Sequence, residues 1–528
     1  MNPVEEFNKK YTSLRKDQKP IFEQMQSNDR LNICSPTGFG KGYIMITDLL
    51  KRIIYSDDRK IAIATHRLTL NTQHMNDIIK ELESVLKNII LVFVGSKDYI
   101  PNPAVEKIIR GQGLHVEELV KISLEKSYIN DLITKYHLDK KIIIVTTYNS
   151  MDKLSDITID RFYCDEAHLL ATSLNSESDK SFRKNFKKLT YKSIFYFTAT
   201  PKDCVSDVDG DEFLMNNEKI FGERIGINLK QAIDGAYITK PLIHIATPEG
   251  FEGIDSENLD NLSKFILECF ENNEELIKEN SISPDDIEAK ILVRCKNVDQ
   301  MWALNDKMLD KTDDDITIFA GASRKGNGSE CYEIDGIGIS KDKHLDALQA
   351  LPDTQKSIVL HVDTLSEGVN VEGFTGVMFL SDVSPTIMKL LQNIGRALRL
   401  NKKDRKNIRD KVISSKNYST WVKPFSYVIL PIYSQESYES QHRVAQLIKE
   451  LRDYGIESNF KINFGSDIAK GIQPEPVPYA DEKPFPDPRK RIIQNIQHHI
   501  ETIESTEREE EYVSMEIYEK IDYLADND

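Results

Sequence analysis

Short apolar runs rich in β-branched residues alternate with helical patterns along most of this chain. This alternation is typical of α/β proteins built on parallel sheets, because each crossover between parallel strands needs a helix-length connection. We predict two series of strands, with a join near residues 225–240. The first series is Leu31–Cys34, Lys60–Thr65, Ile89–Val94, Lys141–Thr146, Ile159–Cys164 and Ser193–Thr198, and the second is Leu242–Ala246, Lys290–Arg294, Ile316–Ala320, Ser357–Val362, Val377–Ser381 and Tyr427–Leu430. Two such series predict two doubly wound domains, with a polar, Gly-rich loop or insertion over 321–343.

The length of 528 residues allows two or three domains, and a hydrophobic content of 40% is enough for sizeable cores. The chain has no apolar run of about 18 residues, so we expect no membrane span. It also lacks the basic and apolar start of a secretory signal, and its six cysteines are scattered. We therefore expect a soluble intracellular protein, cytoplasmic or nucleoid-associated. Its Ile- and Lys-rich composition suggests an AT-rich genome, such as that of a phage or virus.

The C-terminal part differs in composition from the rest. Six prolines fall within 474–488, which is typical of an extended linker. Residues 489–528 carry apolar side chains at helical spacing, so they could dock on the rest of the chain or on a protein partner. Residues 501–528 hold eleven acidic residues against Arg508 and Lys520, a net −9 of the total −16. The net charge neither supports nor excludes nucleic acid, because gripping a strand needs only a local basic groove.

The segment Ser35–Lys41 follows the first predicted strand and precedes a predicted helix. Glycines at 38 and 40 let backbone N–H groups approach phosphate oxygens, beside Thr37, and Lys41 supplies a cation. The next residue in such loops is normally a serine or threonine whose hydroxyl ligates Mg²⁺, whereas this chain has Gly42. Either a water fills that coordination position, or ATP hydrolysis is weakened or lost.

Acidic residues follow the predicted strand Ile159–Cys164, in the order Asp165-Glu166-Ala167-His168. Ligands of open α/β sheets bind at this end of the strands. We expect Asp165 to hold Mg²⁺, and Glu166 to orient and deprotonate the attacking water. His168 would connect this site to other motifs.

Two arginines, Arg396 and Arg399, are three residues apart in a pattern that we predict to be helical, so they share one helix face. Paired guanidiniums suit the charge that develops on a transferring phosphoryl group. They lie more than 200 residues beyond Asp165 and Glu166. An ATP site assembled from such distant segments implies two lobes that close around the nucleotide.

The order of these motifs resembles that of superfamily 2 helicases and translocases of the DEAH type. It is most similar to the branch of restriction-enzyme motors and of phage and repair DNA helicases, over about residues 10–435. The resemblance implies nucleotide contacts from Arg15, Gln18, Thr37, Gly38, Gly40, Lys41, Gly42, Glu367, Gly368 and Asn370, where the family usually has Asp at 370. It implies nucleic-acid contacts from His66, Arg67, Thr146, Thr147 and Arg294, and coupling roles for His168, Thr198, Thr200 and Gln392.

The resemblance also implies two tandem RecA-like parallel-sheet domains, at 1–235 and 236–435, and a small, mainly helical C-terminal region at 436–528. The expected activity is that of an ATP- and Mg²⁺-dependent motor on nucleic acid. DNA is favoured over RNA by Thr198-Ala199-Thr200-Pro201, where RNA helicases commonly have Ser-Ala-Thr, and by Ile220–Ile238, which resembles the crossover of restriction motors. Two alternatives remain open: an RNA helicase, and a nucleotide-gated scaffold subunit of a defence or repair complex that lost hydrolysis through Gly42.

Overall fold

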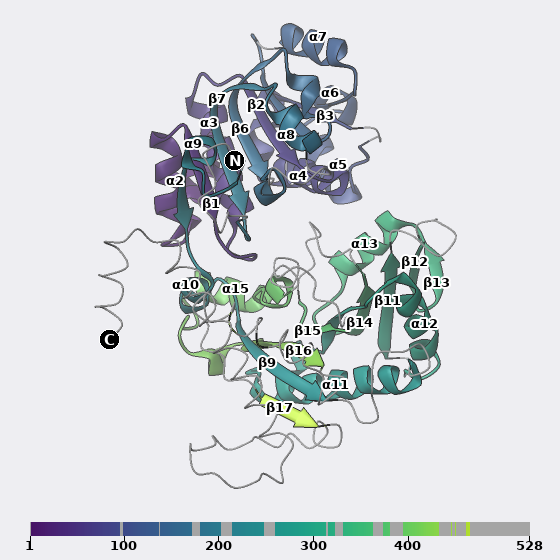
Figure 1. The fold of residues 1–528 in the computed structure, drawn as a ribbon. Helices are drawn as coiled ribbons and strands as arrows, with labels where there is room; N and C mark the ends of the chain where they lie inside the picture. Colours follow the sequence, from purple (N-terminus) through teal and green to yellow (C-terminus); the bar gives the residue numbers. More distant parts are fainter. Residues whose placement is uncertain are drawn as a thin grey trace, which may run out of the picture. The chain divides into compact units, whose positions relative to one another are not determined.

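The computed structural model in Figure 1 divides the chain into two compact units, Met1–Ala232 (unit 1) and Ile233–Asp528 (unit 2). The residues it describes are 2–95, 99–136, 138–171, 180–201, 214–247, 259–312, 315–322, 331–362, 373–380, 394–431, 445, 449 and 461–464. Four predicted site residues, Glu367, Gly368, Asn370 and Gln392, lie outside the described residues, as do the proline-rich segment and the predicted C-terminal helices.

The described part of unit 1 is built on an eight-stranded sheet in the order β4-β3-β5-β2-β6-β7-β1-β8. All of its described pairings are parallel. The strands are β1 (Arg30–Cys34), β2 (Lys60–Thr65), β3 (Ile89–Val94), β4 (Val120–Ile122), β5 (Lys141–Thr147), β6 (Thr158–Asp165), β7 (Thr190–Thr198) and β8 (Glu223–Gly226). Central strands such as β5 are buried along their whole length, which is why they read as continuous apolar runs in the sequence.

Helices cover both faces of this sheet. They are α1 (Pro3–Ser13), α2 (Gln18–Ser27), α3 (Lys41–Tyr55), α4 (Leu68–Glu81), α5 (Pro103–Gly111), α6 (Val116–Leu119), α7 (Lys126–Tyr136), α8 (Lys180–Phe186) and α9 (Glu218–Phe221). Ile129 and Leu132 of α7 pack with Ile142 and Ile144 of β5 in one core cluster. Helix α4, whose apolar residues are not part of that cluster, also packs on β5. Helix α10 (Leu229–Asp234) contains the boundary between the units.

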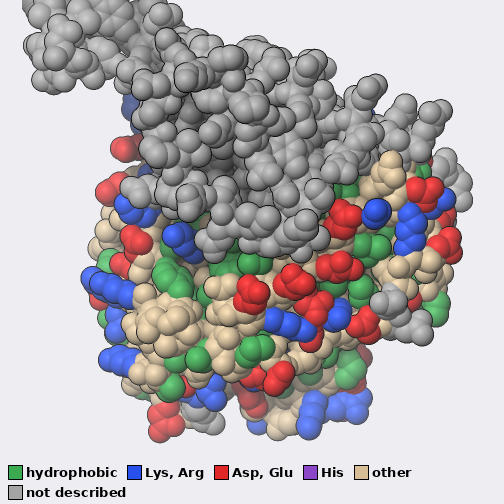
Figure 2. Space-filling view, turned by 90° about the horizontal axis from the view of Figure 1, so that it is seen from below, with side chains coloured by type: hydrophobic (Ala, Val, Ile, Leu, Met, Phe, Trp, Pro, Cys, Tyr) green, Lys and Arg blue, Asp and Glu red, His purple; other side chains and the backbone are tan. Residues whose placement is uncertain are grey.

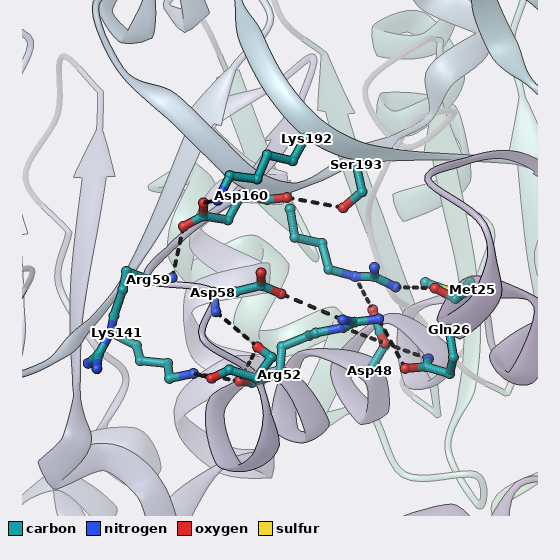
Figure 3. Close-up of polar contacts among 12 residues, drawn as sticks. Met25, Gln26, Asp48, Arg52, Asp58, Arg59, Lys141, Asp160, Lys192 and Ser193 are labelled. Atoms are coloured by element: carbon teal, nitrogen blue, oxygen red, sulfur yellow. Dashed lines mark hydrogen bonds and ion pairs between the residues drawn. The ribbon is translucent and has the colours of Figure 1, made fainter.

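A buried polar network holds α2, α3 and β6 together. Asp48 of α3 is fully buried and accepts hydrogen bonds from Arg161 Nε of β6 at 2.6 Å and from Gln26 Nε2 of α2 at 2.8 Å. Arg161 also donates to the carbonyl of Met25 at 2.7 Å, and Figure 3 shows how Gln26, Met25 and Arg52 surround Asp48. Removing one partner of a buried ion pair typically costs about 3–5 kcal/mol. The network therefore fixes the relative positions of three elements that carry predicted site residues.

The described part of unit 2 is built on a nine-stranded mixed sheet in the order β13-β12-β11-β14-β10-β15-β16-β9-β17. Its strands are β9 (Lys240–Thr247), β10 (Lys290–Arg294), β11 (Ile316–Ala322), β12 (Cys331–Ile334), β13 (Ile337–Ile339), β14 (Lys356–His361), β15 (Gly376–Phe379), β16 (Phe425–Pro431) and β17 (Lys461–Phe464). Pairings among the described strands are parallel except those of β12 with β11 and β13. The longer described helices are α11 (Leu259–Asn280), α12 (Val298–Leu309), α13 (Lys341–Ala350) and α15 (Lys402–Arg409).

The predicted fold class is confirmed, and each of the predicted strands lies within or overlaps an observed strand. The stretch 321–343, predicted to be a loop or an insertion, contains an antiparallel hairpin of β12 and β13 and so is not a loop throughout. Asp335 and Gly336 connect these strands with φ values of 47° and 75°. Two positive φ values are what a tight hairpin turn of primed type requires, and Asp-Gly favours it. That dipeptide was the local signal for the hairpin.

In the described part of the chain, no helix combines the length and apolar character needed to cross a membrane. On the described surface drawn in Figure 2, Lys and Arg side chains are interspersed with Asp and Glu. On this face, therefore, the negative net charge of the chain does not form one contiguous acidic patch.

Candidate nucleotide-binding site

The parallel sheet of unit 1 brings the first predicted motifs to one edge. The phosphate loop follows β1, Asp165 ends β6 and Thr198 ends β7, which lies between these two strands. The register places Cys34 beside Thr198 and Asp165 beside Phe197. Segments more than 100 residues apart in sequence are neighbours here because parallel strands end at the same edge.

The phosphate loop depends on two glycines with left-handed backbone conformations. Gly38 and Gly40 have φ values of 91° and 95°. A Cβ atom on Gly40 would lie 2.6 Å from Gln18 Nε2. That amide donates to the carbonyl of Phe39 at 2.7 Å, while Gln18 Oε1 accepts from the backbone N–H of Arg15 at 2.9 Å. In this structure the Gln18 side chain therefore links the phosphate loop at Phe39 to the backbone of Arg15.

Lys41 begins helix α3, whose first N–H groups and dipole favour an anion. Its ammonium donates to the carbonyl of Ser35 at 2.5 Å, so it lies along the loop itself. The following residue, Gly42, is exposed, and a Cβ atom built there meets nothing within 4 Å. No packing contact therefore requires glycine at position 42, and the loop has room for the hydroxyl side chain that it lacks.

Asp165 is contacted by a residue that the sequence reasoning missed. His74 Nε2 of α4 lies 3.0 Å from Asp165 Oδ2. Burial opposes ionisation of Asp165, but the hydrogen bond with His74 and the charges of His74 and Lys41 hold its pKa below the usual value. The available signal was a polar residue within the apolar stripe of a helix, because His74 lies four residues after Leu70 and four before Ile78.

Glu166 has an unusual backbone conformation for a residue with a side chain. Its φ is 54°, in the left-handed region, and its N–H donates to Asp165 Oδ1 at 3.1 Å. Such conformations cost about 1–3 kcal/mol and concentrate at functional sites. Glu166 Oε2 lies 3.5 Å from His168 Nδ1, which in turn is 3.0 Å from Thr198 Oγ1.

Thr198 extends this chain of contacts to Thr200. Its hydroxyl accepts from the backbone N–H of Thr200 at 3.2 Å. The residues predicted to couple hydrolysis to strand binding, His168, Thr198 and Thr200, are thus connected to Glu166 by successive polar contacts. All three of them are buried.

The residues of unit 1 predicted to contact nucleic acid differ in exposure. His66 and Arg67 are half-buried and immediately precede α4. Thr146 is fully buried and Thr147 nearly so, and the Thr146 hydroxyl is directed to the carbonyl of Thr147. Only His66 and Arg67 of these four offer accessible side-chain surface in this conformation.

In unit 2, Arg294 ends β10 and His361 ends the neighbouring strand β14. Burial and the charges of Arg294 and Arg396 lower the pKa of His361 well below its ordinary value. The prediction that one helix carries both Arg396 and Arg399 is wrong at the C-terminal end of that helix. Among the described residues the helical turn covers 394–397, and Arg399 forms an isolated antiparallel bridge with Ile238.

Comparisons with known proteins assign both parts of the chain to helicase-type sequences. Residues 8–203 match the family described as "Type III restriction enzyme, res subunit", and residues 275–401 match "Helicase conserved C-terminal domain". No curated protein sequence matches this chain.

Solved structures share its fold. The ATP-dependent Type ISP restriction-modification enzyme LlaBIII bound to DNA is similar with a TM-score of 0.55 and 14% identity, over 87% of this chain and 32% of that one. A nuclease-deletion mutant of the Type ISP enzyme LlaGI with a DNA substrate mimic has a TM-score of 0.51 and 15% identity, over 85% and 30%. S. cerevisiae Dbp5 bound to RNA and ADP BeF3 has a TM-score of 0.50 and 11% identity, over 94% and 97%. This chain spans about a third of the length of the two restriction-modification enzymes.

Proposed function

We propose that this chain, which belongs to helicase superfamily 2, is an ATP-dependent motor that acts on DNA. The observation that carries the proposal is the edge of the unit 1 sheet, to which the strands bring the phosphate loop, Asp165 and Glu166. There a chain of polar contacts runs from Glu166 through His168 to Thr198. Such a chain can link the presence of the γ-phosphate to the segments predicted to contact the strand.

The residues of unit 1 fit ATP and Mg²⁺. The loop glycines with φ values above 90° open backbone N–H groups to phosphate, and Lys41 adds a positive charge. Asp165, whose pKa is held low, is ionised at neutral pH and can hold the metal. Mg²⁺, when bound, neutralises charge on the phosphate oxygens. Glu166 orients the attacking water and accepts its proton.

The remaining predicted residues complete the proposal. Arg396 and Arg399 stabilise the charge that develops on the γ-phosphate, and Gln18 and Arg15 contact the adenine. Glu367, Gly368 and Asn370 also contact the nucleotide, and Gln392 takes part in coupling. His66, Arg67, Thr146, Thr147 and Arg294 contact the phosphate backbone of the strand, which is read without regard to sequence.

DNA is the favoured track because residues 8–203 match a restriction-enzyme subunit family and because Thr198-Ala199-Thr200-Pro201 replaces Ser-Ala-Thr. An RNA helicase is the first alternative. The second is a nucleotide-gated scaffold, motivated by Gly42, in which ATP binds but is not hydrolysed.

One assay separates the three. ATP hydrolysis is measured with no nucleic acid, single-stranded DNA, duplex DNA and RNA, over a range of Mg²⁺ concentrations. We expect hydrolysis to be stimulated by DNA and abolished by Lys41→Ala. Stimulation by RNA alone supports the RNA helicase. ATP binding without hydrolysis under every condition supports the scaffold.

A further inference from the structure

We infer that Lys423 is a positioning residue for Arg396 and Arg399: its buried ammonium fixes the backbone from which both guanidiniums project. This inference rests on the proposed function, because it concerns the residues that would stabilise the transferring phosphoryl group. Lys423 would act through the main chain and touch no nucleotide.

The ammonium of Lys423 makes three short hydrogen bonds to backbone carbonyls. It donates to Ala397 at 2.6 Å, to Arg399 at 2.7 Å and to Phe374, before β15, at 2.6 Å. Only 1% of the Lys423 side chain is exposed. A lysine ammonium has three N–H donors, so all of them are used, and two hold the turn that carries the arginines.

Two hydroxyl side chains complete the same arrangement. Ser426 Oγ of β16 donates to the carbonyl of Ala397 at 2.6 Å. The backbone N–H and the hydroxyl of Thr239 reach the carbonyl of Leu398 at 2.7 Å and 3.1 Å. Ser426 and Thr239 also contact each other at 2.7 Å.

Three successive carbonyls, those of residues 397–399, therefore have partners from segments that precede or begin β9 and β16. The last carbonyls of a helical turn have no partner within the helix, and water or a capping side chain commonly satisfies them. Here buried side chains do so, and the bridge of Arg399 with Ile238 adds a further restraint. The turn is thus attached to the segments that lead into β9 and β16 and not only to its own helix.

Burying a charged ammonium to cap backbone carbonyls costs desolvation free energy. This cost argues that Lys423 does something other than stabilise the fold. Burial lowers the pKa of Lys423 to about 7, while the charges of Asp353 and Asp404 act against that shift and those of Lys290 and Arg405 add to it. The hydrogen bonds of the Asp404 carboxylate are to the backbone N–H groups of Val422 and Lys423, at 2.7 Å and 2.8 Å. Asp404 therefore positions the segment that delivers Lys423.

Lys423 meets a requirement for precise placement of Arg396 and Arg399. Groups that stabilise a transition state must be held within about 0.5 Å of their productive position, and a misplacement of about 1 Å can cost about a hundredfold in rate. Arg396 is buried and Arg399 is half-buried. The position of the backbone therefore largely determines where their guanidinium groups lie.

The test compares two lysine-to-methionine variants of the full chain. Lys423→Met removes the ammonium and keeps an unbranched side chain. The matched control is Lys290→Met, since Lys290 is equally buried but contacts the carbonyl of Leu351 and the Asp353 carboxylate, and not the arginine turn. DNA-stimulated kcat, the Kd for ATP and the melting temperature are measured for each.

We expect Lys423→Met to lower kcat by about 10- to 100-fold with the Kd for ATP changed less than about twofold, and Lys290→Met to lower the melting temperature with kcat retained. Ser426→Ala removes a single hydrogen bond to the same turn and should lower kcat several-fold. If Lys423→Met does not fold, the kcat of Ser426→Ala tests the inference instead. Wild-type kcat in both Lys423→Met and Ser426→Ala, or an equal loss in Lys290→Met, overturns this inference alone. No hydrolysis by the wild-type protein overturns the proposed function as well.

Discussion

His74 Nε2 lies 3.0 Å from Asp165 Oδ2, so helix α4 directly contacts the carboxylate proposed to hold Mg²⁺. The same helix begins immediately after His66 and Arg67, which are proposed to contact the strand. Burial disfavours a charged imidazole, but the hydrogen bond to Asp165 and the nearby carboxylates raise the pKa of His74. One rigid element thus joins a proposed strand contact to a proposed metal ligand.

Replacing His74 by alanine should destabilise the protein in Mg²⁺-free buffer. The partly buried carboxylate of Asp165 would lose its hydrogen bond to His74, which typically costs about 1–3 kcal/mol. Denaturant unfolding with and without Mg²⁺ measures the loss. His74→Gln, which keeps an N–H donor, should lose less. Equal stability of wild type and His74→Ala would show that this contact contributes little.

Lys41→Ala should reduce ATP hydrolysis to background, because the loop would lose its cation for the phosphates. Lys51→Ala is the matched control on the same helix, since Lys51 lies over the Phe22 ring and away from the loop. Steady-state hydrolysis and ATP binding are compared for the two variants. DNA-stimulated hydrolysis that persists in Lys41→Ala would mean that the loop has another role.

Glu166→Gln should preserve ATP binding and lower kcat by at least about 100-fold, because an amide cannot accept the proton of the attacking water. The substitution keeps the shape of the side chain at a position whose φ is 54°. Trapped ATP should also tighten DNA binding. Binding of a fluorescent ATP analogue and single-turnover hydrolysis measure the two effects separately. A parallel loss of ATP binding would assign Glu166 a structural role.

Gly42→Thr should lower the Mg²⁺ concentration needed for hydrolysis, with kcat equal or higher, because it restores a hydroxyl ligand beside the phosphates. A Cβ atom at this position meets nothing within 4 Å, so the fold should tolerate the change. Gly42→Val has nearly the same shape without the hydroxyl and should leave the Mg²⁺ requirement unchanged. Identical Mg²⁺ titrations for the two variants would rule out metal ligation through residue 42.

Unit 2 should lose stability in acid through His344. This side chain is 2% exposed, packs against the rings of Phe319 and Tyr332, and neither ring nitrogen has a hydrogen-bond partner. Burial lowers the pKa of His344 to about 4. The unfolded chain, with a histidine pKa of about 6.5, therefore takes up its proton first as the pH falls.

The contribution of His344 is fully present above about pH 6.5 and is lost as the pH falls toward 4, by up to about 3 kcal/mol. His344→Leu should remove that part of the acid sensitivity. Denaturant unfolding from pH 7 to pH 4.5 compares the two proteins. If the free energies of unfolding of wild type and His344→Leu fall in parallel over this range, His344 is not buried in its neutral form.

Much of this protein could be predicted from local sequence. Continuous apolar runs such as Lys141–Thr146 identify strands buried on both faces, because a buried parallel strand needs apolar side chains on both sides. The spacing of Gly38, Gly40 and Lys41 likewise predicts a phosphate loop, since its geometry is set within a few residues. Both kinds of feature depend on neighbours along the chain, and the sequence is sufficient to determine them.

The contacts that support the site are decided only by the tertiary structure. His74 and Asp165 are 91 residues apart, and Thr239 lies 159 residues from the carbonyl of Leu398 that it holds. Helical spacing predicted that Arg399 would continue the helix of Arg396, but pairing with Ile238 ends that helix earlier. The physical reason is the same in each case: a buried polar group takes whichever partner the packed fold brings to it, and the packing of helices and strands decides which distant residue that is.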